Sequence, residues 1–233
     1  MPPEIRMFNC DCMEAMSKMK DKEFSLALVD PPYGIGDFQT TGDANKYKKH
    51  KEKKYLDVKK WNMAIPTPEY FSELKRVSVN QIIWGANYYN CFSDGGGCIV
   101  WDKKNESTQR YSNCDIASCT MQKKISIFRY TWNGFIQEAN KDKEDRIHSC
   151  QKPVALYKWL LQNYAKPGDK IFDSHAGSFS SAIACYDLGF DYTGCELDAD
   201  YFNAAKARYE KHISQGTLFT PDMKPQMVQQ SLI

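Results

Sequence analysis

The sequence contains no Cys-x-x-Cys pair, no Gly-x-Gly-x-x-Gly fingerprint and no long apolar run. A membrane-spanning helix needs about 18 consecutive apolar residues, so none is expected. The first residues also lack the apolar stretch of a signal peptide. The net charge of only +2 identifies no partner by itself. These absences favour a cytoplasmic globular protein that does not contact a membrane.

Nine cysteines are present, which is an odd number for a framework of disulfides. Neither their spacings nor the four histidines form a zinc-binding pattern. We therefore expect no metal site, and we expect reduced thiols that lie mostly in the core: Cys10, Cys12, Cys91, Cys98, Cys114, Cys119, Cys150, Cys185 and Cys195.

Strand and helix patterns alternate along much of the chain, which predicts a mainly parallel twisted sheet with helices on both faces. The predicted strands are 24–29, 81–84, 98–101, 115–121, 124–132, 170–173 and 192–196. The predicted helices are 12–20, 68–78, 153–165, 178–188 and 198–213. We expect one α/β domain over 1–214 that includes a basic mobile loop at 35–62 and a short loop at 133–147, followed by a flexible tail at 215–233.

The turn Asp30-Pro31-Pro32-Tyr33 follows the apolar run Phe24 to Val29. Two prolines cannot continue a strand ladder, so the chain must turn at the carboxyl end of this strand, where α/β sheets bind ligands. The turn offers a carboxylate, the carbonyl of Pro31 and the ring of Tyr33, which together suit a planar heterocycle with an exocyclic amine. The alternative is a turn that only caps the strand, with Asp30 as turn former and Tyr33 as packing.

A second turn, Asp173 to Ser178, follows a predicted strand and opens a predicted helix. Small residues there let backbone amides approach a ligand. Glu196 ends the next strand, at the spacing from which a carboxylate holds a ribose diol. Because the glycine fingerprint is absent, a nucleoside without phosphates fits better than a dinucleotide.

Together the two turns resemble the beta group of DNA amino-methyltransferases, in which the Asp-Pro-Pro-Tyr motif precedes the cofactor motif. The resemblance extends from about residue 8 to about residue 210 and is to adenine-specific, phage-like members. It implies a Rossmann-like fold, S-adenosylmethionine as cofactor, and methyl transfer to the N6 amine of a flipped adenine in DNA. Asp30, Pro31, Pro32 and Tyr33 would be the catalytic residues.

The resemblance also implies a set of cofactor contacts. His148 to Pro153 is similar to the family's His-Pro-Thr-Gln-Lys-Pro segment, whose lysine faces the cofactor's methionine carboxylate. Asp11 would lie near the cofactor's adenine and Glu196 at its ribose. The implied contacts are Asp11, Asp30, Gln151, Lys152, Asp173, His175, Gly177, Ser178, Glu196 and Leu197.

Two departures from the family pattern stand at these motifs. The turn from Asp173 to Ser178 corresponds to the family's cofactor turn, and Phe179 replaces the glycine that usually follows it. The side chain of Phe179 therefore either packs into the following helix or narrows the pocket. Ser149-Cys150 replaces Pro-Thr, while Gln151-Lys152-Pro153 is intact. The alternatives to an adenine enzyme are therefore a cytosine-N4 methyltransferase and an inactive DNA-binding relative. RNA and protein amides are further substrates that the same pocket would accept.

The partner expected from these features is double-stranded DNA. Lys48, Lys49, Lys53 and Lys54 lie directly after the catalytic turn and are interleaved with aromatic residues, which favours phosphate contacts over a merely solvated face. An aromatic such as Phe38 would complete the cage around the base. Gln215 to Phe219 resembles a sliding-clamp peptide, although Leu218 and Phe219 packing back on the domain is the alternative. Members of the group often form homodimers. A restriction partner and a solitary role are both compatible with the sequence.

Overall fold

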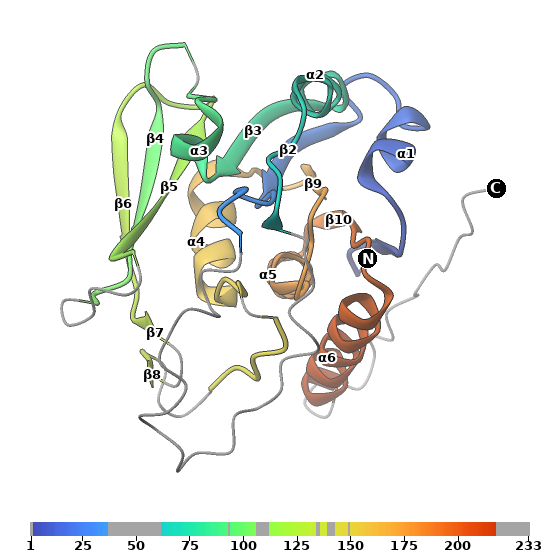
Figure 1. Cartoon of the computed structure of the whole chain (residues 1–233). Coiled ribbons are helices and arrows are strands. Elements are labelled where there is room, and N and C mark those ends of the chain that lie inside the picture. Colours follow the sequence, from blue (N-terminus) through green and yellow to red (C-terminus); the bar gives the residue numbers. More distant parts are fainter. Residues whose placement is uncertain are drawn as a thin grey trace.

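The computed structural model describes residues 2–36, 62–92, 94–105, 112–133, 136–138, 143–148 and 150–217. Its main sheet has eight strands in the order β1-β10-β9-β2-β3-β5-β4-β6 (Figure 1). These strands are β1 (Ile5–Phe8), β2 (Phe24–Val29), β3 (Ser78–Trp84), β4 (Cys98–Asp102), β5 (Cys114–Cys119), β6 (Ile125–Arg129), β9 (Lys170–Asp173) and β10 (Asp191–Cys195). The helices are α1 (Cys12–Ser17), α2 (Pro68–Val77), α3 (Ala86–Tyr89), α4 (Val154–Tyr164), α5 (Ser180–Leu188) and α6 (Ala199–Thr217).

The sheet is mainly parallel, as predicted. Strand β5 alone runs against its neighbours β3 and β4, while every other pairing in the sheet is parallel. The carboxyl ends of β10, β9, β2 and β3 consequently meet at one edge of the sheet. This edge contains both turns that the sequence analysis singled out.

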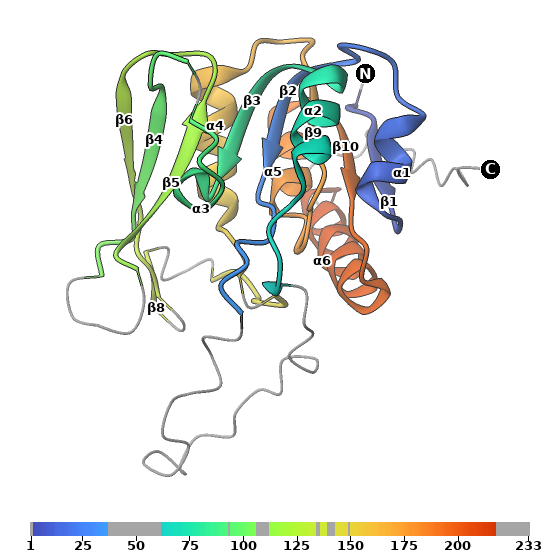
Figure 2. The ribbon, with the colours of Figure 1, turned by 45° about the horizontal axis from the view of Figure 1, so that its top comes forward.

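Helices cover both faces of the sheet, which explains why its central strand β2 is apolar from Leu26 to Val29. In β2, Leu26 and Leu28 pack on the face covered by α4 and α5, and Ala27 and Val29 pack on the opposite face with α2. All four side chains are buried. Figure 2 shows α2 in front of the sheet and α4 and α5 behind it. A strand buried on both faces reads as a continuous apolar run, as this one does.

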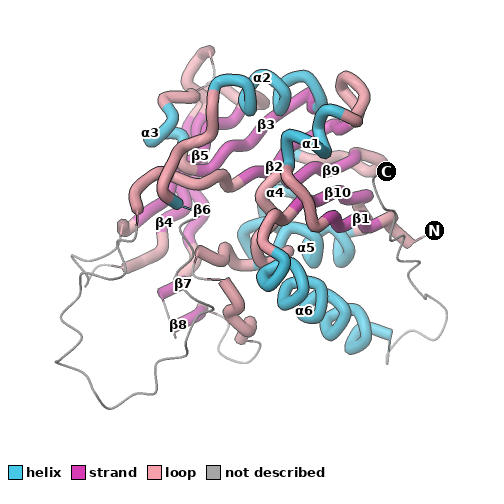
Figure 3. The backbone as a smooth tube through the Cα atoms, turned by 45° about the vertical axis from the view of Figure 1, so that its right-hand side comes forward, coloured by secondary structure: helices cyan, strands magenta, loops and turns pink. Residues whose placement is uncertain are grey.

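Several segments differ from their predicted bounds: the first helix ends at Ser17, and the strand predicted at 124–132 ends at Arg129. Strand β3 begins at Ser78, immediately after α2, because the Ser78 hydroxyl caps the helix by donating to the carbonyl of Leu74 (2.5 Å). The predicted loop 133–147 contains a strand: β8 (Ile136–Gln137) pairs with β7 (Trp132–Asn133) in a small antiparallel sheet. Figure 3 shows this pair apart from the main sheet. The predicted tail starts inside α6, which continues to Thr217.

The cysteines are free thiols, but fewer of them are buried than predicted. Cys98, Cys119, Cys185 and Cys195 are buried, Cys150 is exposed and the other four are partly buried. Among the helices that the structure describes, none is long and apolar enough to cross a membrane.

Candidate active site

Three acidic residues lie at the shared carboxyl edge of the sheet. Asp30 follows β2, Asp173 ends β9 and Glu196 follows β10, and these strands are neighbours in the order β10-β9-β2. Residues that are far apart in the sequence are therefore brought to one edge. The two predicted sites are adjacent parts of a single site.

Asp30 is held by two hydrogen-bond donors. The Lys152 ammonium lies 2.5 Å from its Oδ2, and the Tyr33 hydroxyl donates to its Oδ1 (2.6 Å). Lys152 also donates to the Tyr33 hydroxyl oxygen (3.1 Å). Because only 5% of the Lys152 side chain and 15% of the Asp30 side chain are exposed, this pair is largely shielded from water. Lys152, which the family resemblance assigned to the cofactor, is thus the ion-pair partner of Asp30 in this structure.

Helix α3 supports the catalytic turn, and the sequence analysis gave it no role. The Tyr89 hydroxyl donates to the carbonyls of Pro31 (2.5 Å) and Pro32 (3.0 Å). The ring of Tyr88 stacks on that of Tyr33, with 4.8 Å between centroids and 15° between planes. An aromatic neighbour of Tyr33 is therefore supplied by α3, whereas the predicted Phe38 lies outside the described residues. The position of both tyrosines just after β3, next to β2, was the available clue.

Asn62 is a second residue that sequence reasoning missed. Its side-chain oxygen accepts hydrogen bonds from the backbone amides of Tyr33 (2.7 Å) and Gly34 (3.2 Å). Its carbonyl accepts another from the amide of Gly36 (3.0 Å). The two described ends of the basic segment 35–62 are thereby joined beside the catalytic turn. Its lysines Lys48, Lys49, Lys53 and Lys54 lie outside the described residues.

The buried side chain of Asp173 fixes the cofactor turn by hydrogen bonds. It is 1% exposed, and it accepts hydrogen bonds from the Ser181 hydroxyl (2.6 Å) and the His175 amide (3.2 Å). Burial raises the pKa of Asp173 to about 7. Burial also lowers the pKa of His175 to about 4, which leaves its ring neutral near pH 7. The turn is therefore held by buried polar groups with little net charge.

Phe179 packs into the core and does not narrow the site. Its side chain is 0% exposed and meets the ring of Phe202 edge-on, with centroids 5.8 Å apart. The residue has a φ of 53°, in the left-handed region that favours glycine. A phenylalanine thus occupies a backbone conformation that favours glycine, and burial of its large ring offsets the conformational cost.

Glu196 is fixed by backbone amides at the predicted ribose position. Its carboxylate accepts from the amides of Gly177 (2.9 Å) and Asp198 (2.9 Å), and burial raises its pKa. The neighbouring Leu197 is 69% exposed, a large apolar surface directly beside this carboxylate. Asn9 joins the end of β1 to this loop by donating to the carbonyls of Glu196 and Leu197.

Three other residues that were predicted to bind the cofactor form hydrogen bonds within the protein. Asp11 is the amino-terminal cap of α1, where its Oδ1 accepts from the amides of Met13 and Glu14. Gln151 is buried and its side chain bridges the amide of Ile147 and the carbonyl of Asp145. The hydroxyl of Ser178 is within 3.1 Å of that of Ser180.

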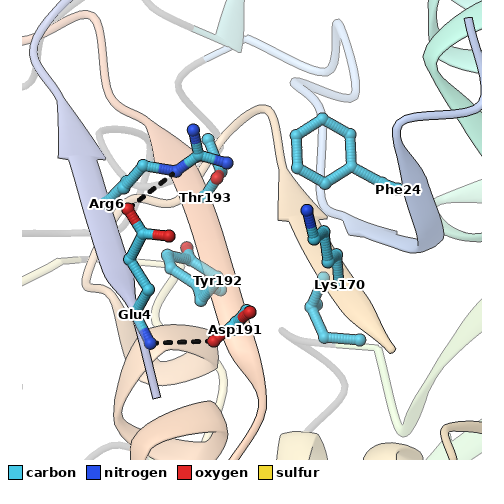
Figure 4. A pocket seen from close by; sticks show the side chains of 8 residues that line it. Glu4, Arg6, Phe24, Lys170, Asp191, Tyr192 and Thr193 are labelled. Carbon is cyan, nitrogen blue, oxygen red and sulfur yellow. Dashed lines mark hydrogen bonds and ion pairs between the residues drawn. The ribbon is translucent and has the colours of Figure 1, made fainter. Parts of the chain in front are cut away.

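Two small hollows were found in the described part of the chain. One, of about 50 Å³, is lined by Tyr33, Tyr88 and Asp115 among others and opens beside the catalytic turn. The other lies between β1, β10, β9 and β2, with Glu4, Arg6 and Lys170 on its rim (Figure 4). The latter measures only about 10 Å³, room for one water molecule, and lies at the amino-terminal ends of the strands. This hollow is too small for a cofactor, so it is not the candidate active site.

The buried Asp173 carboxyl makes a testable contribution to stability. Between about pH 4 and pH 7 the folded protein retains a proton that the unfolded chain has lost. The contribution of the Asp173 carboxyl to wild-type stability should therefore fall as pH rises through this window, by at most about 1.4 kcal/mol per pH unit. Asp173→Asn has no such proton, so its stability relative to wild type should rise up to pH 7 and then level off. Chemical denaturation of both proteins at pH 5, 6, 7 and 8 measures this difference, and a difference independent of pH would contradict the assignment.

A family model described as a DNA methylase matches residues 79–207. Two curated relatives from Moraxella bovis are similar over most of their length. The type II methyltransferase M2.MboI is 21% identical, and the alignment covers 89% of this chain and 88% of the relative. The type II methyltransferase M1.MboII is 23% identical, with 86% and 94% covered.

Solved structures of methyltransferases share the architecture. PvuII DNA methyltransferase, which is described as cytosine-N4-specific, gives a TM-score of 0.56 at 10% identity over 91% of this chain and 93% of its own. The complex of M1.HpyAVI with S-adenosylmethionine gives 0.53 at 18% identity over 88% and 99%. These likenesses establish the Rossmann-like methyltransferase fold. Because the family model matches more than half of the sequence, this chain belongs to the N6 and N4 DNA methylase family.

Proposed function

We propose that this protein transfers a methyl group from S-adenosylmethionine to the N6 amine of an adenine flipped out of duplex DNA. The observation that carries the proposal is the placement of Asp30 and the Pro31 carbonyl beside the cofactor turn, at the switch between β2 and β9. The family model supports the coarser part of the proposal, methylation of DNA, independently of the Asp-Pro-Pro-Tyr turn, because that turn lies outside residues 79–207, which the model matches.

The residues at the carboxyl edge fit S-adenosylmethionine. Glu196 would accept hydrogen bonds from the ribose hydroxyls, and Leu197 would cover one face of the adenine. Lys152 offers the cationic group that an amino-acid carboxylate requires. When bound, the cofactor supplies an electrophilic sulfonium methyl group. At Gly177 a Cβ atom would meet only the His148 ring and the His175 carbonyl oxygen, both at 4.0 Å.

Asp30 and Pro31 would orient the target amine. A base amine is a weak nucleophile because its lone pair is delocalised into the ring. Hydrogen bonds from the amine to Asp30 and to the Pro31 carbonyl favour a pyramidal nitrogen whose lone pair faces the methyl group. Asp30 has capacity for this bond, because each carboxylate oxygen offers about two acceptor sites and accepts one donor here. Its charge also stabilises the positive charge that develops on nitrogen.

The hollow beside Tyr33 is where a flipped base would enter. Tyr33 and Tyr88 form its aromatic wall, and Asp115, held by Lys103 at 2.8 Å, adds a polar group. Flipping costs a few kcal/mol, which stacking on aromatic rings offsets. The lysines at 48, 49, 53 and 54 would contact DNA phosphates, since their segment is attached next to this wall through Asn62.

Cytosine N4 is the second candidate substrate, because the structurally similar PvuII enzyme is described as cytosine-N4-specific. Both amines can donate to Asp30 and Pro31. The aspartate at the first position of the motif favours adenine through its family resemblance.

The product of the reaction identifies the substrate. The protein is incubated with S-adenosylmethionine and mixed-sequence duplex DNA, the DNA is digested to nucleosides, and the products are identified by mass. N6-methyladenine is expected. N4-methylcytosine would retain the mechanism but reverse the base, and a protein that binds the cofactor tightly yet methylates neither base in any sequence pool would refute the function.

A further inference from the structure

Arg208, on α6, lies outside every motif used so far, yet its guanidinium is buried against the cofactor turn. It donates to the Ser178 carbonyl (2.8 Å) and to the Ser180 hydroxyl (3.1 Å). Its other terminal nitrogen lies 2.6 Å from Oε2 of Glu144. Only 9% of the Arg208 side chain and 18% of the Glu144 side chain are exposed.

Glu144 extends this contact to the segment that contains Lys152. Its Oε1 accepts from the amide of Val154, the first residue of α4 and two positions after Lys152. The Glu144 backbone is itself fixed, because its amide and carbonyl both bond the Gln137 side chain on β8 (2.8 and 3.0 Å). Arg208 and Glu144 therefore connect α6, the cofactor turn, the start of α4 and the small sheet.

The energetics of a buried ion pair favour a geometric role. Removing two charges from water costs about as much as their attraction returns, and apolar replacements are often no less stable. Here burial lowers the pKa of Arg208 and raises that of Glu144, as expected for a desolvated pair. An apolar pair would lack the planar guanidinium of Arg208, which donates to a carboxylate and to a backbone carbonyl at defined positions.

We propose that Arg208 and Glu144 are positioning residues that hold the cofactor turn at Ser178 and the Lys152 segment at the separation required to bind S-adenosylmethionine. This inference rests on the proposed function for the identity of the ligand. Neither residue reaches the reacting atoms. Their effect acts through Ser178 and through Val154, so it should appear in cofactor affinity and only weakly in the chemical step.

The chain provides a matched control on the same two elements. Lys211, one turn further along α6, pairs with Asp145, which follows Glu144, at 3.0 Å. That pair is 63% and 67% exposed, and its ion pair joins α6 to residue 145 rather than to the cofactor turn. Lys211→Met therefore removes the same kind of charge from the same helix without disturbing Ser178.

The test compares Arg208→Met with Lys211→Met in the full-length protein. Isothermal titration gives the Kd for S-adenosylmethionine, and steady-state methylation gives KM and kcat. Loss of one charge-assisted hydrogen bond corresponds to about a tenfold rise in Kd. Arg208→Met should show that rise in Kd and KM with kcat changed less than about threefold, while Lys211→Met should match wild type. Arg208→Lys, which keeps the charge but not the fork, should fall between them.

Each outcome decides between a positioning role and a merely structural one. The inference would be overturned by an Arg208→Met variant that is less stable than wild type but binds the cofactor equally well. If Arg208→Met does not fold, Glu144→Gln, which keeps the shape of the side chain, takes its place with the same expectation and with Asp145→Asn as control. A wild-type protein that binds the cofactor without methylating DNA would refute the proposed function alone, because the binding comparison still tests the pair.

Discussion

Asp30→Asn is expected to lower the rate of methyl transfer by at least about a thousandfold while leaving the Kd for S-adenosylmethionine within about threefold of wild type. Asparagine keeps the size of the side chain and one acceptor oxygen. It removes the negative charge that would face the attacking amine and replaces an acceptor with a donor. Single-turnover methylation of DNA measures the chemical step, and titration of the cofactor measures binding separately. A variant with near wild-type transfer would remove Asp30 from the mechanism.

The structure shows why alanine is a poorer choice at this position. Asp30→Ala would leave the Lys152 ammonium, which is 5% exposed, without its carboxylate. An uncompensated buried charge costs about 3–5 kcal/mol, so loss of activity could reflect loss of folding. The double variant Asp30→Asn with Lys152→Met removes both charges and serves as the control. Its melting temperature should exceed that of Asp30→Ala, while its transfer rate should remain as low as that of Asp30→Asn.

Gly85→Ala is expected to lower kcat by about a hundredfold through displacement of Tyr33. A Cβ atom at Gly85 would lie 2.4 Å from Cε1 of Tyr33 and 3.1 Å from the Tyr89 hydroxyl oxygen. The Tyr33 ring must therefore move, which breaks its bond to Asp30 and its stack on Tyr88. The cofactor turn is not touched, so the Kd for S-adenosylmethionine should stay near the wild-type value.

Gly96→Ala separates this steric effect from backbone strain. Gly85 has a φ of +79° and Gly96 a φ of +73°, so an L-residue costs about 1–2 kcal/mol at either position. A Cβ at Gly96, however, would meet nothing within 4 Å. Both variants should lose similar stability from the backbone, and only Gly85→Ala should lose activity. Equal losses of activity in the two variants would show that the close approach of Tyr33 is not needed for transfer.

Lys152 and Phe179 show how much of the site's geometry sequence motifs can predict. The family resemblance assigned the lysine to the cofactor's carboxylate, and the structure places it on Asp30, because the start of α4 and the end of β2 meet at one sheet edge. For Phe179 the sequence left two orientations open. The choice depends on whether Phe202, on α6, leaves room for the ring, and that is a property of helix packing.

The sequence by itself determined most of the elements and the residue types at the candidate site. A continuous apolar run with two prolines after it specifies a buried strand and a sharp turn, so Asp30 could be located from local residues alone. The spacing from Asp173 to Glu196 likewise spans one strand, one helix and the next strand. Tertiary structure alone decided the partners: Tyr88 and Tyr89 at the catalytic turn, Asn62 at its backbone, and Arg208 on the cofactor turn. The physical reason is that these contacts join residues about 30 or more positions apart in the sequence. Which strands become neighbours in the sheet, and so bring such residues together, is encoded by no local pattern.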